Sequence, residues 1–215
     1  MSAAVALIDY GSGNLHSAEK ALMRAAADLA HPPSVATTDD ADLIAKADAI
    51  VLPGVGAFSA CRRALMERPG VVEAITAACV DRGAPFLGIC VGMQLMATRG
   101  LEFGETPGFD WIAGDVVRLA PSEARFKLPH VGWNSLEFGP ENPLFRDLPA
   151  RTDMYFTHSF ALKVRNEVDA SAWTDHGGRF AAAVAKDNLA GVQFHPEKSQ
   201  AAGLRLLANF LAWRP

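Results

Sequence analysis

A short apolar run that ends at a cysteine between two glycines constrains this chain more than any other stretch of its sequence. The run covers residues 86–89, and its length predicts a buried strand, whereas residues 91–97 predict a helix. Cys90 stands at the junction, with Gly88 and Gly92 two residues to either side. Such a strand, cysteine and helix fit a nucleophile elbow, the G-x-S-x-G arrangement with sulfur in place of oxygen.

The same junction would make the sulfur of Cys90 reactive. Glycine lets the backbone turn sharply and lets the helix approach the strand closely. The start of the helix then directs backbone N–H groups and the positive end of its dipole at the sulfur, which favours the thiolate. Because the pattern is short, a buried structural cysteine accounts for these residues equally well when they are taken alone.

Composition limits the class of protein and its surroundings. The 215 residues, half of them hydrophobic, can form one α/β domain over residues 1–215 with a full core. With a formal net charge of −4 and no basic tract, nucleic acid is not an expected partner. Three cysteines without a C-x-x-C pair argue against disulfides and structural zinc and favour a reducing cytoplasm. Residues 1–10 lack the basic region of a signal peptide, and no apolar run is long enough to span a membrane.

The first half of the chain alternates apolar runs with helical patterns. Strands are expected at residues 5–8, 34–37 and 49–52, and helices at 15–30, 38–45 including a cap, 58–66 and 71–80. Continuous apolar runs such as residues 5–8 are typical of central parallel strands. Cys61 and Cys79 fall within two of the helical patterns, where we expect them to be small core residues.

From residue 111 onwards the pattern changes to short alternating segments. Strands are expected at 116–119, 128–133, 154–162, 168–173, 180–184 and 189–194, several of them antiparallel. A helical turn at 142–148 and a final helix at 199–213 complete the set. The expected fold is therefore an open, largely parallel twisted α/β sheet flanked by helices, with an added antiparallel β-rich portion in the C-terminal half.

Two loops near the expected strand ends carry further candidates. Gly54 and Gly56 stand on either side of Val55, so the peptide units between them can reorient and aim an N–H group at a developing oxyanion. An ordinary glycine turn accounts for this loop equally well. In residues 99–104, Glu102 can accept the ammonium group of a substrate, although such a residue is more often a solvated surface carboxylate.

A candidate base for the cysteine lies far downstream. His195 follows an expected strand, and Glu197 comes after one proline. A nucleophilic thiol needs a base within hydrogen-bond reach, and that base needs an orienting group. Since parallel strands end on one edge of an open sheet, these two residues can meet Cys90 there. We expect a surface position or a local hydrogen bond for His16, His31 and His176, while His130 and His158 stay open as alternatives.

Several motifs together resemble those of the triad-type, or class I, glutamine amidotransferases. Residues 88–94 (Gly-Ile-Cys-Val-Gly-Met-Gln) and 194–197 (Phe-His-Pro-Glu) carry this resemblance. Four further segments narrow it to one branch of the family: 9–14, 53–56, 129–134 and 195–199. The resemblance runs from residue 9 to residue 199, nearly the whole chain.

The resemblance implies a glutaminase without a cofactor or a metal. Cys90 would attack the side-chain amide of glutamine, releasing ammonia and leaving a thioester that water hydrolyses to glutamate. His195 would shuttle protons, and Glu197 would orient it. The oxyanion hole would use the backbone N–H of Val91 and one from the loop of Gly54, Val55 and Gly56. The matching glutamine-binding positions are Gln94, Glu102, Ser159 and Phe160.

The resemblance also implies a partner. The ammonia would pass to a (β/α)₈-barrel cyclase subunit of a heterodimer, which makes imidazole glycerol phosphate in histidine biosynthesis. The positions that would lie near the partner surface are Asn14, His130, Trp133, Tyr155 and Lys198. Two of these positions have a second interpretation, because Trp133 also fits a core residue and Lys198 also fits a solvated charge.

Three other interpretations remain at this stage. Another amidotransferase of the same class would use the same Cys90, His195 and Glu197. A catalytically silent subunit that only scaffolds its partner would not need these three residues. A cysteine peptidase would use similar nucleophile chemistry, but Gln94 and Glu102 favour a small amino-acid substrate.

Overall fold

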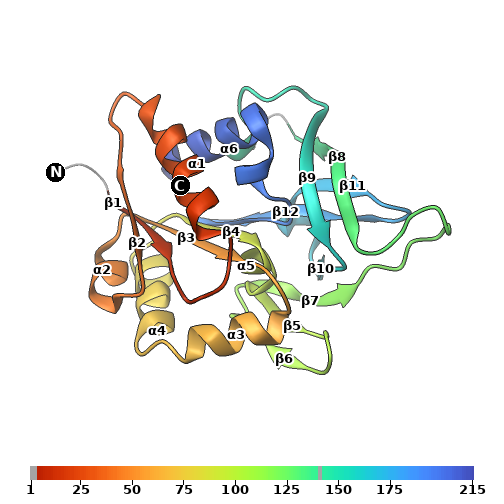
Figure 1. The fold of residues 1–215 in the computed structure, drawn as a ribbon, viewed down its shortest axis with the longest axis horizontal. Helices are drawn as coiled ribbons and strands as arrows, with labels where there is room; N and C mark the ends of the chain where they lie inside the picture. Colours follow the sequence, from red (N-terminus) through yellow and green to blue (C-terminus); the bar gives the residue numbers. More distant parts are fainter. Residues whose placement is uncertain (1–3, 140–141) are drawn as a thin grey trace.

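Five parallel strands place the two halves of the chain side by side. In the computed structural model, which describes residues 4–139 and 142–215, the larger sheet has the order β2-β1-β3-β4-β13-β12-β11-β8-β9 (Figure 1). The parallel strands are β1 (Ala4–Ile8), β2 (Ser34–Thr38), β3 (Ala49–Gly54), β4 (Phe86–Cys90) and β13 (Leu189–Val192). Because β13 pairs directly with β4, a strand near the C-terminus lies beside the strand that ends at Cys90. Residues 1–3, part of the segment in which we expect no signal peptide, lie outside the described residues.

The antiparallel portion continues the same sheet. Its strands are β12 (Arg179–Lys186), β11 (Ala170–Asp175), β8 (His130–Phe138) and β9 (Thr152–His158). A second, smaller sheet has the order β10-β7-β5-β6 and contains β10 (Phe160–Val164), β7 (Ile112–Arg118), β5 (Ala97–Gly100) and β6 (Thr106–Pro107). The predicted fold class is confirmed: the sheet is parallel from β2 to β13 and antiparallel from β13 to β9.

Helices cover both faces of the larger sheet (Figure 1). On one face α1 (Leu15–Ala27) packs against α6 (Gln200–Ala212), and on the other lie α2 (Ala41–Lys46), α3 (Phe58–Met66) and α4 (Val71–Thr76). The carboxylate of Asp40 caps α2 by accepting the N–H groups of Asp42 and Leu43 at 2.9 and 3.2 Å, as its position before the helix predicts. No helix within the described residues has both the length and the apolar character needed to cross a membrane.

Two predicted elements close to the candidate site have wrong boundaries. The helix expected at 91–97 is only α5 (Val91–Gln94), and residues 97–100 form β5 instead of continuing the helix into a loop. The chain after Gln94 finds other backbone partners, since the Leu95 carbonyl accepts from Phe109 at 2.7 Å. The single strand expected at 154–162 is divided at Ser159, because β9 pairs with β8 and β10 pairs with β7 in the smaller sheet.

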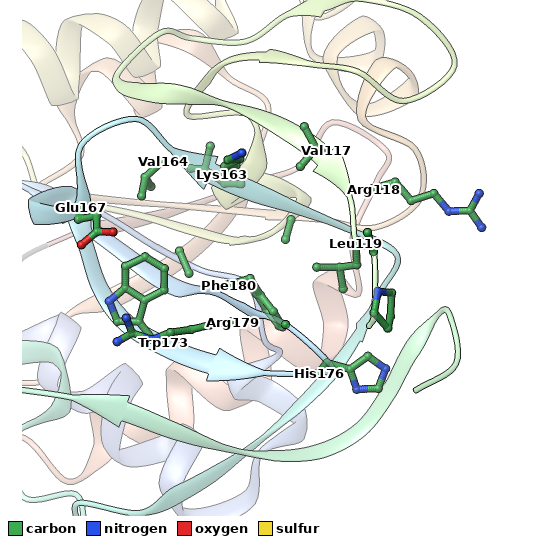
Figure 2. A pocket seen from close by; sticks show the side chains of 16 residues that line it. Val117, Arg118, Leu119, Lys163, Val164, Glu167, Trp173, His176, Arg179 and Phe180 are labelled. Carbon is green, nitrogen blue, oxygen red and sulfur yellow. The ribbon is translucent and has the colours of Figure 1, made fainter. Parts of the chain in front are cut away.

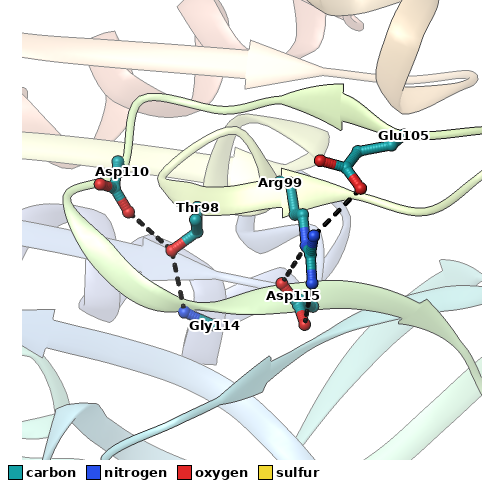
Figure 3. A network of polar contacts seen from close by, with 6 residues as sticks. All are labelled: Thr98, Arg99, Glu105, Asp110, Gly114 and Asp115. Atoms are coloured by element: carbon teal, nitrogen blue, oxygen red, sulfur yellow. Dashed lines mark hydrogen bonds and ion pairs between the residues drawn. The ribbon is translucent and has the colours of Figure 1, made fainter.

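The smaller sheet holds the loop that carries Glu102. Arg99 on β5 forms ion pairs with Asp115 on β7 at 2.8 Å and with Glu105, beyond the loop, at 3.0 Å (Figure 3). The neighbouring Thr98 hydroxyl donates to Asp110 at 2.6 Å. The start of the loop is therefore attached to β7 through Arg99, and its end is attached to Arg99 through Glu105, which limits where the Glu102 carboxylate can reach.

Candidate active site

The cysteine elbow forms where β4 meets α5. Cys90 is 4% exposed and adopts a φ of +55°, a conformation that L residues rarely occupy. A Cβ atom on Gly88 would lie 2.6 Å from the backbone of Gly92, and one on Gly92 would overlap the carbonyl oxygen of Leu52 on β3. The two glycines are therefore required by the close contact of the elbow with its neighbours, which is the packing the sequence pattern predicts.

Neighbouring parallel strands bring His195 to the cysteine. In the pairing of β13 with β4, Val192 lies opposite Ile89, so both chains leave the sheet at the same edge. Cys90 and His195 line one cavity of about 310 Å³. The Nδ1 atom of His195 lies 2.8 Å from Oε1 of Glu197, and both side chains are at most 3% exposed. Its Nε2 atom has no hydrogen-bond partner among the described residues, so this nitrogen is the one available to exchange a proton.

The surroundings of His195 favour its charged form. Burial lowers the pKa of this imidazole, but its interactions with Cys90 and Glu197 outweigh burial and raise the pKa to about 9. These interactions therefore stabilise the imidazolium that forms when Nε2 of the ring takes the proton of the Cys90 thiol. Glu197 holds the other ring nitrogen in place, as in other nucleophile, histidine and carboxylate sites.

The alternative bases have no carboxylate partner within the part of the chain that the structure describes. Burial lowers the pKa of His130 to about 3 and that of His158 to about 4, so both rings are neutral at pH 7. Nδ1 of His130 lies 3.1 Å from Nε2 of His158, and the opposite nitrogen of His158 lies 2.9 Å from the Phe160 carbonyl oxygen. His176, for which we expect a surface position or a local hydrogen bond, lies 2.9 Å through Nε2 from the Lys127 carbonyl oxygen and also stacks on His130 with ring centroids 4.0 Å apart. These three rings form a packed cluster beside the cavity.

The candidate oxyanion loop is held by contacts that sequence analysis did not reveal. Gly54 lies opposite Cys90 in the β3–β4 pairing, and Val55 and Gly56 line the cavity. The Val55 N–H donates to the Ser12 hydroxyl oxygen at 3.4 Å, and the Val55 carbonyl accepts from the same hydroxyl at 2.8 Å and from the Cys61 thiol at 3.3 Å. The Val55 amide is thus engaged by Ser12 instead of being free for a reacting oxygen.

The four positions matched to glutamine binding share this cavity. Gln94 is buried and donates to the Phe160 carbonyl at 2.9 Å and to Oε1 of Gln193 at 3.1 Å. Glu102 accepts the N–H of Phe58, the first residue of α3, at 2.9 Å. The cavity lining contains Gln94, Glu102, Ser159 and Phe160 together with Cys90 and Val91. Sequence analysis gave no role to Gln193, although it directly precedes the motif of residues 194–197 that carries His195.

Of the five residues expected near the partner surface, three form a patch on this chain, namely Trp133, Tyr155 and Lys198. Trp133 is 48% exposed, so it is not a core residue, and its ring meets that of Tyr155 edge to face with centroids 5.9 Å apart. The Lys198 ammonium lies 5.9 Å from the Tyr155 ring centroid. Asn14 is exposed at the start of α1. His130 is only 3% exposed, so its side chain takes no part in this patch.

A second cavity lies apart from the candidate site. It has a volume of about 340 Å³ and is lined by β7, β10, β11 and β12, with Trp173 and Glu167 towards one end and His176 towards the other (Figure 2). Its lining shares no residue with the candidate site. The catalytic chemistry is therefore assigned to the smaller cavity, which holds Cys90 and His195.

Comparisons with known proteins match this geometry. The family model described as "Glutamine amidotransferase class-I" matches residues 6–213. "Imidazole glycerol phosphate synthase subunit HisH" from Caulobacter vibrioides is 57% identical over 211 residues, which cover 98% of this chain and 99% of the relative. The protein of the same name from Ruegeria pomeroyi is 51% identical over 210 residues, covering 98% and 99%. Among solved structures, PurLQS from Thermotoga maritima has a similar fold, with a TM-score of 0.65 at 20% identity over 99% of both chains.

Proposed function

We propose that this chain, which belongs to the class-I glutamine amidotransferases, is the glutaminase subunit of an imidazole glycerol phosphate synthase. It hydrolyses glutamine to glutamate and ammonia, and the ammonia serves histidine biosynthesis. The observation that carries this proposal is the shared cavity in which Cys90 and His195 meet Gln94 and Glu102.

The proposed reaction uses Cys90 as nucleophile. Its thiol proton passes to Nε2 of His195, and the sulfur attacks the side-chain carbonyl carbon of glutamine. The N–H of Val91 and one from the Val55 loop hold the negative oxygen of the tetrahedral intermediate. His195 returns the proton to the leaving nitrogen, so ammonia departs and a thioester remains. Water, deprotonated by the same ring, then releases glutamate and restores the cysteine.

The residues that complete the site support the choice of substrate. The Glu102 carboxylate at the cavity offers a partner for the ammonium group of an amino acid. Gln94 and the backbone around Ser159 and Phe160 supply the polar groups that would fix the orientation of glutamine. We assign residues 1–215 to one domain, because strands from both ends of the chain belong to the same sheet.

The partner is proposed to be a (β/α)₈-barrel cyclase that forms a heterodimer with this chain in the cytoplasm. Ammonia in neutral water is mostly protonated and lacks its nucleophilic lone pair, so a dry path to an attached partner preserves its reactivity. The patch of Trp133, Tyr155 and Lys198 supports docking next to the site, since the Tyr155 carbonyl also accepts the His195 N–H at 2.8 Å. All three cysteines are free thiols, as suits a reducing compartment.

The proposal is tested by following both products of the complex. The purified chain is mixed with the separately expressed cyclase and its nucleotide substrate, and glutamate and imidazole glycerol phosphate are measured after addition of glutamine. We expect the two products to appear in a ratio near one, because each glutamine supplies one ammonia. A chain that binds the cyclase but releases no glutamate would be a scaffold and would overturn the proposal.

A further inference from the structure

Two buried side-chain amides connect a backbone carbonyl to the sulfur of Cys90. Gln94 donates through Nε2 to the Phe160 carbonyl at 2.9 Å and to Oε1 of Gln193 at 3.1 Å. Gln193 in turn donates through Nε2 to Sγ of Cys90 at 3.6 Å. The Gln193 side chain is fully buried, and Gln94 is 3% exposed. The three bonds form a continuous row that ends on the reacting atom.

The carbonyl at the start of this row fixes the direction of every bond in it. A backbone carbonyl can only accept, so the Gln94 end that faces Phe160 must be its NH₂ group. The second hydrogen of that group then points to an acceptor, which identifies the nearer atom of Gln193 as its oxygen. The NH₂ group of Gln193 is left facing Cys90. The orientation of this amide thus follows from the network.

The backbone holds Gln193 firmly at this position. The residue follows β13 directly, and its own N–H donates to the Ala182 carbonyl on β12 at 2.8 Å. His195 leaves the same strand end two residues later and lines the cavity beside Cys90. A single segment therefore supplies two different groups to the sulfur, an amide donor and a proton acceptor.

We propose that Gln193 is a further catalytic residue, which stabilises negative charge on the Cys90 sulfur. It keeps its own hydrogens throughout, while the thiol proton moves to His195. The hydrogen bond from its Nε2–H group to the sulfur becomes stronger when the thiolate forms, and again when the thiolate leaves as the thioester is hydrolysed. The reason is that hydrogen bonds to charged groups in a water-excluded site are the stronger ones. The inference rests on the glutaminase activity proposed above.

The test compares Gln193→Met and Gln193→Glu in the complex with the cyclase. Methionine keeps the length of the side chain and removes the N–H donor, whereas glutamate keeps the oxygen for Gln94 and places a second oxygen against the sulfur. We expect kcat for glutamine hydrolysis to fall about 10- to 100-fold with methionine and further with glutamate, with KM nearly unchanged. Alkylation of Cys90 by iodoacetamide at pH 7 should slow by a similar factor.

Controls separate this role from packing. Gln200→Met makes the same exchange at an exposed position and should leave both rates unchanged. Thermal unfolding and co-elution with the cyclase check that each variant is folded, and the isosteric glutamate variant decides the question if methionine disturbs the core. Wild-type kcat and alkylation rates in folded variants would overturn the inference. A wild-type complex that releases no glutamate would instead overturn the proposed function.

Discussion

Replacing Cys90 with alanine is expected to abolish glutamine hydrolysis while leaving the synthesis of imidazole glycerol phosphate from added ammonia intact in the complex. The change removes the sulfur that shares a cavity with His195, so no thioester can form. Loss of the nucleophile in comparable sites lowers kcat by a factor on the order of 10⁴ to 10⁶. The cyclase does not need this sulfur when ammonia is supplied directly.

The measurement is the rate of product formation with glutamine and, separately, with an ammonium salt at alkaline pH. Cys79→Ala is the matched control, since Cys79 is also a buried free thiol but lies in the helical turn Ala77–Asp81, outside the cavity. It should retain glutaminase activity. Loss of both activities in Cys90→Ala would point to a structural role for this cysteine, and retention of both would identify another nucleophile.

The second large effect is expected from partner binding. The isolated chain should hydrolyse glutamine slowly, because the Val55 N–H is engaged by Ser12 and the proposed oxyanion hole therefore lacks its second donor. One oxyanion donor is worth a factor of about 10² to 10³ in kcat, so we expect stimulation of roughly this size when the cyclase and its nucleotide ligand bind. Steady-state glutamate release measures both states.

Replacing Ser12, whose hydroxyl contacts the Val55 peptide, tests this expectation directly. Ser12→Ala removes the hydroxyl that both accepts the Val55 N–H and donates to its carbonyl, so the peptide can reorient more easily. Glutamate release by the isolated variant should rise severalfold, and its stimulation by the cyclase should shrink accordingly. Equal turnover by the wild-type chain with and without the cyclase would show that the loop does not gate the reaction.

Local motifs were sufficient to predict the elbow and its partners. Gly88 and Gly92 indicate a close helix–strand contact around Cys90, and the structure shows why a side chain at either position would collide with the backbone nearby. The apolar run of β4 and its parallel neighbour β13 then place His195 at the same sheet edge. These features depend on short stretches with strong steric requirements, so sequence alone reveals them.

The remaining features depend on contacts between distant segments. The end of α5 at Gln94 is set by pairing with residues near 110, which no local pattern indicates. The hold on Val55 comes from Ser12, and the row of amides passes from Phe160 to Cys90 through residues far apart in the chain. The sequence does not indicate which atom a polar residue of a motif will contact, because that contact depends on how distant segments pack in the fold.

The most direct test of the central claim is to trap the cysteine with a glutamine-like chloroketone. The chain is incubated with this reagent in the presence of the cyclase, and the modified residue is located by peptide mass spectrometry. We predict a single adduct on Cys90, slowed by added glutamine and by His195→Ala, with Cys61 and Cys79 unmodified. An adduct on one of these two cysteines with Cys90 unmodified, or a rate indifferent to glutamine, would contradict the account.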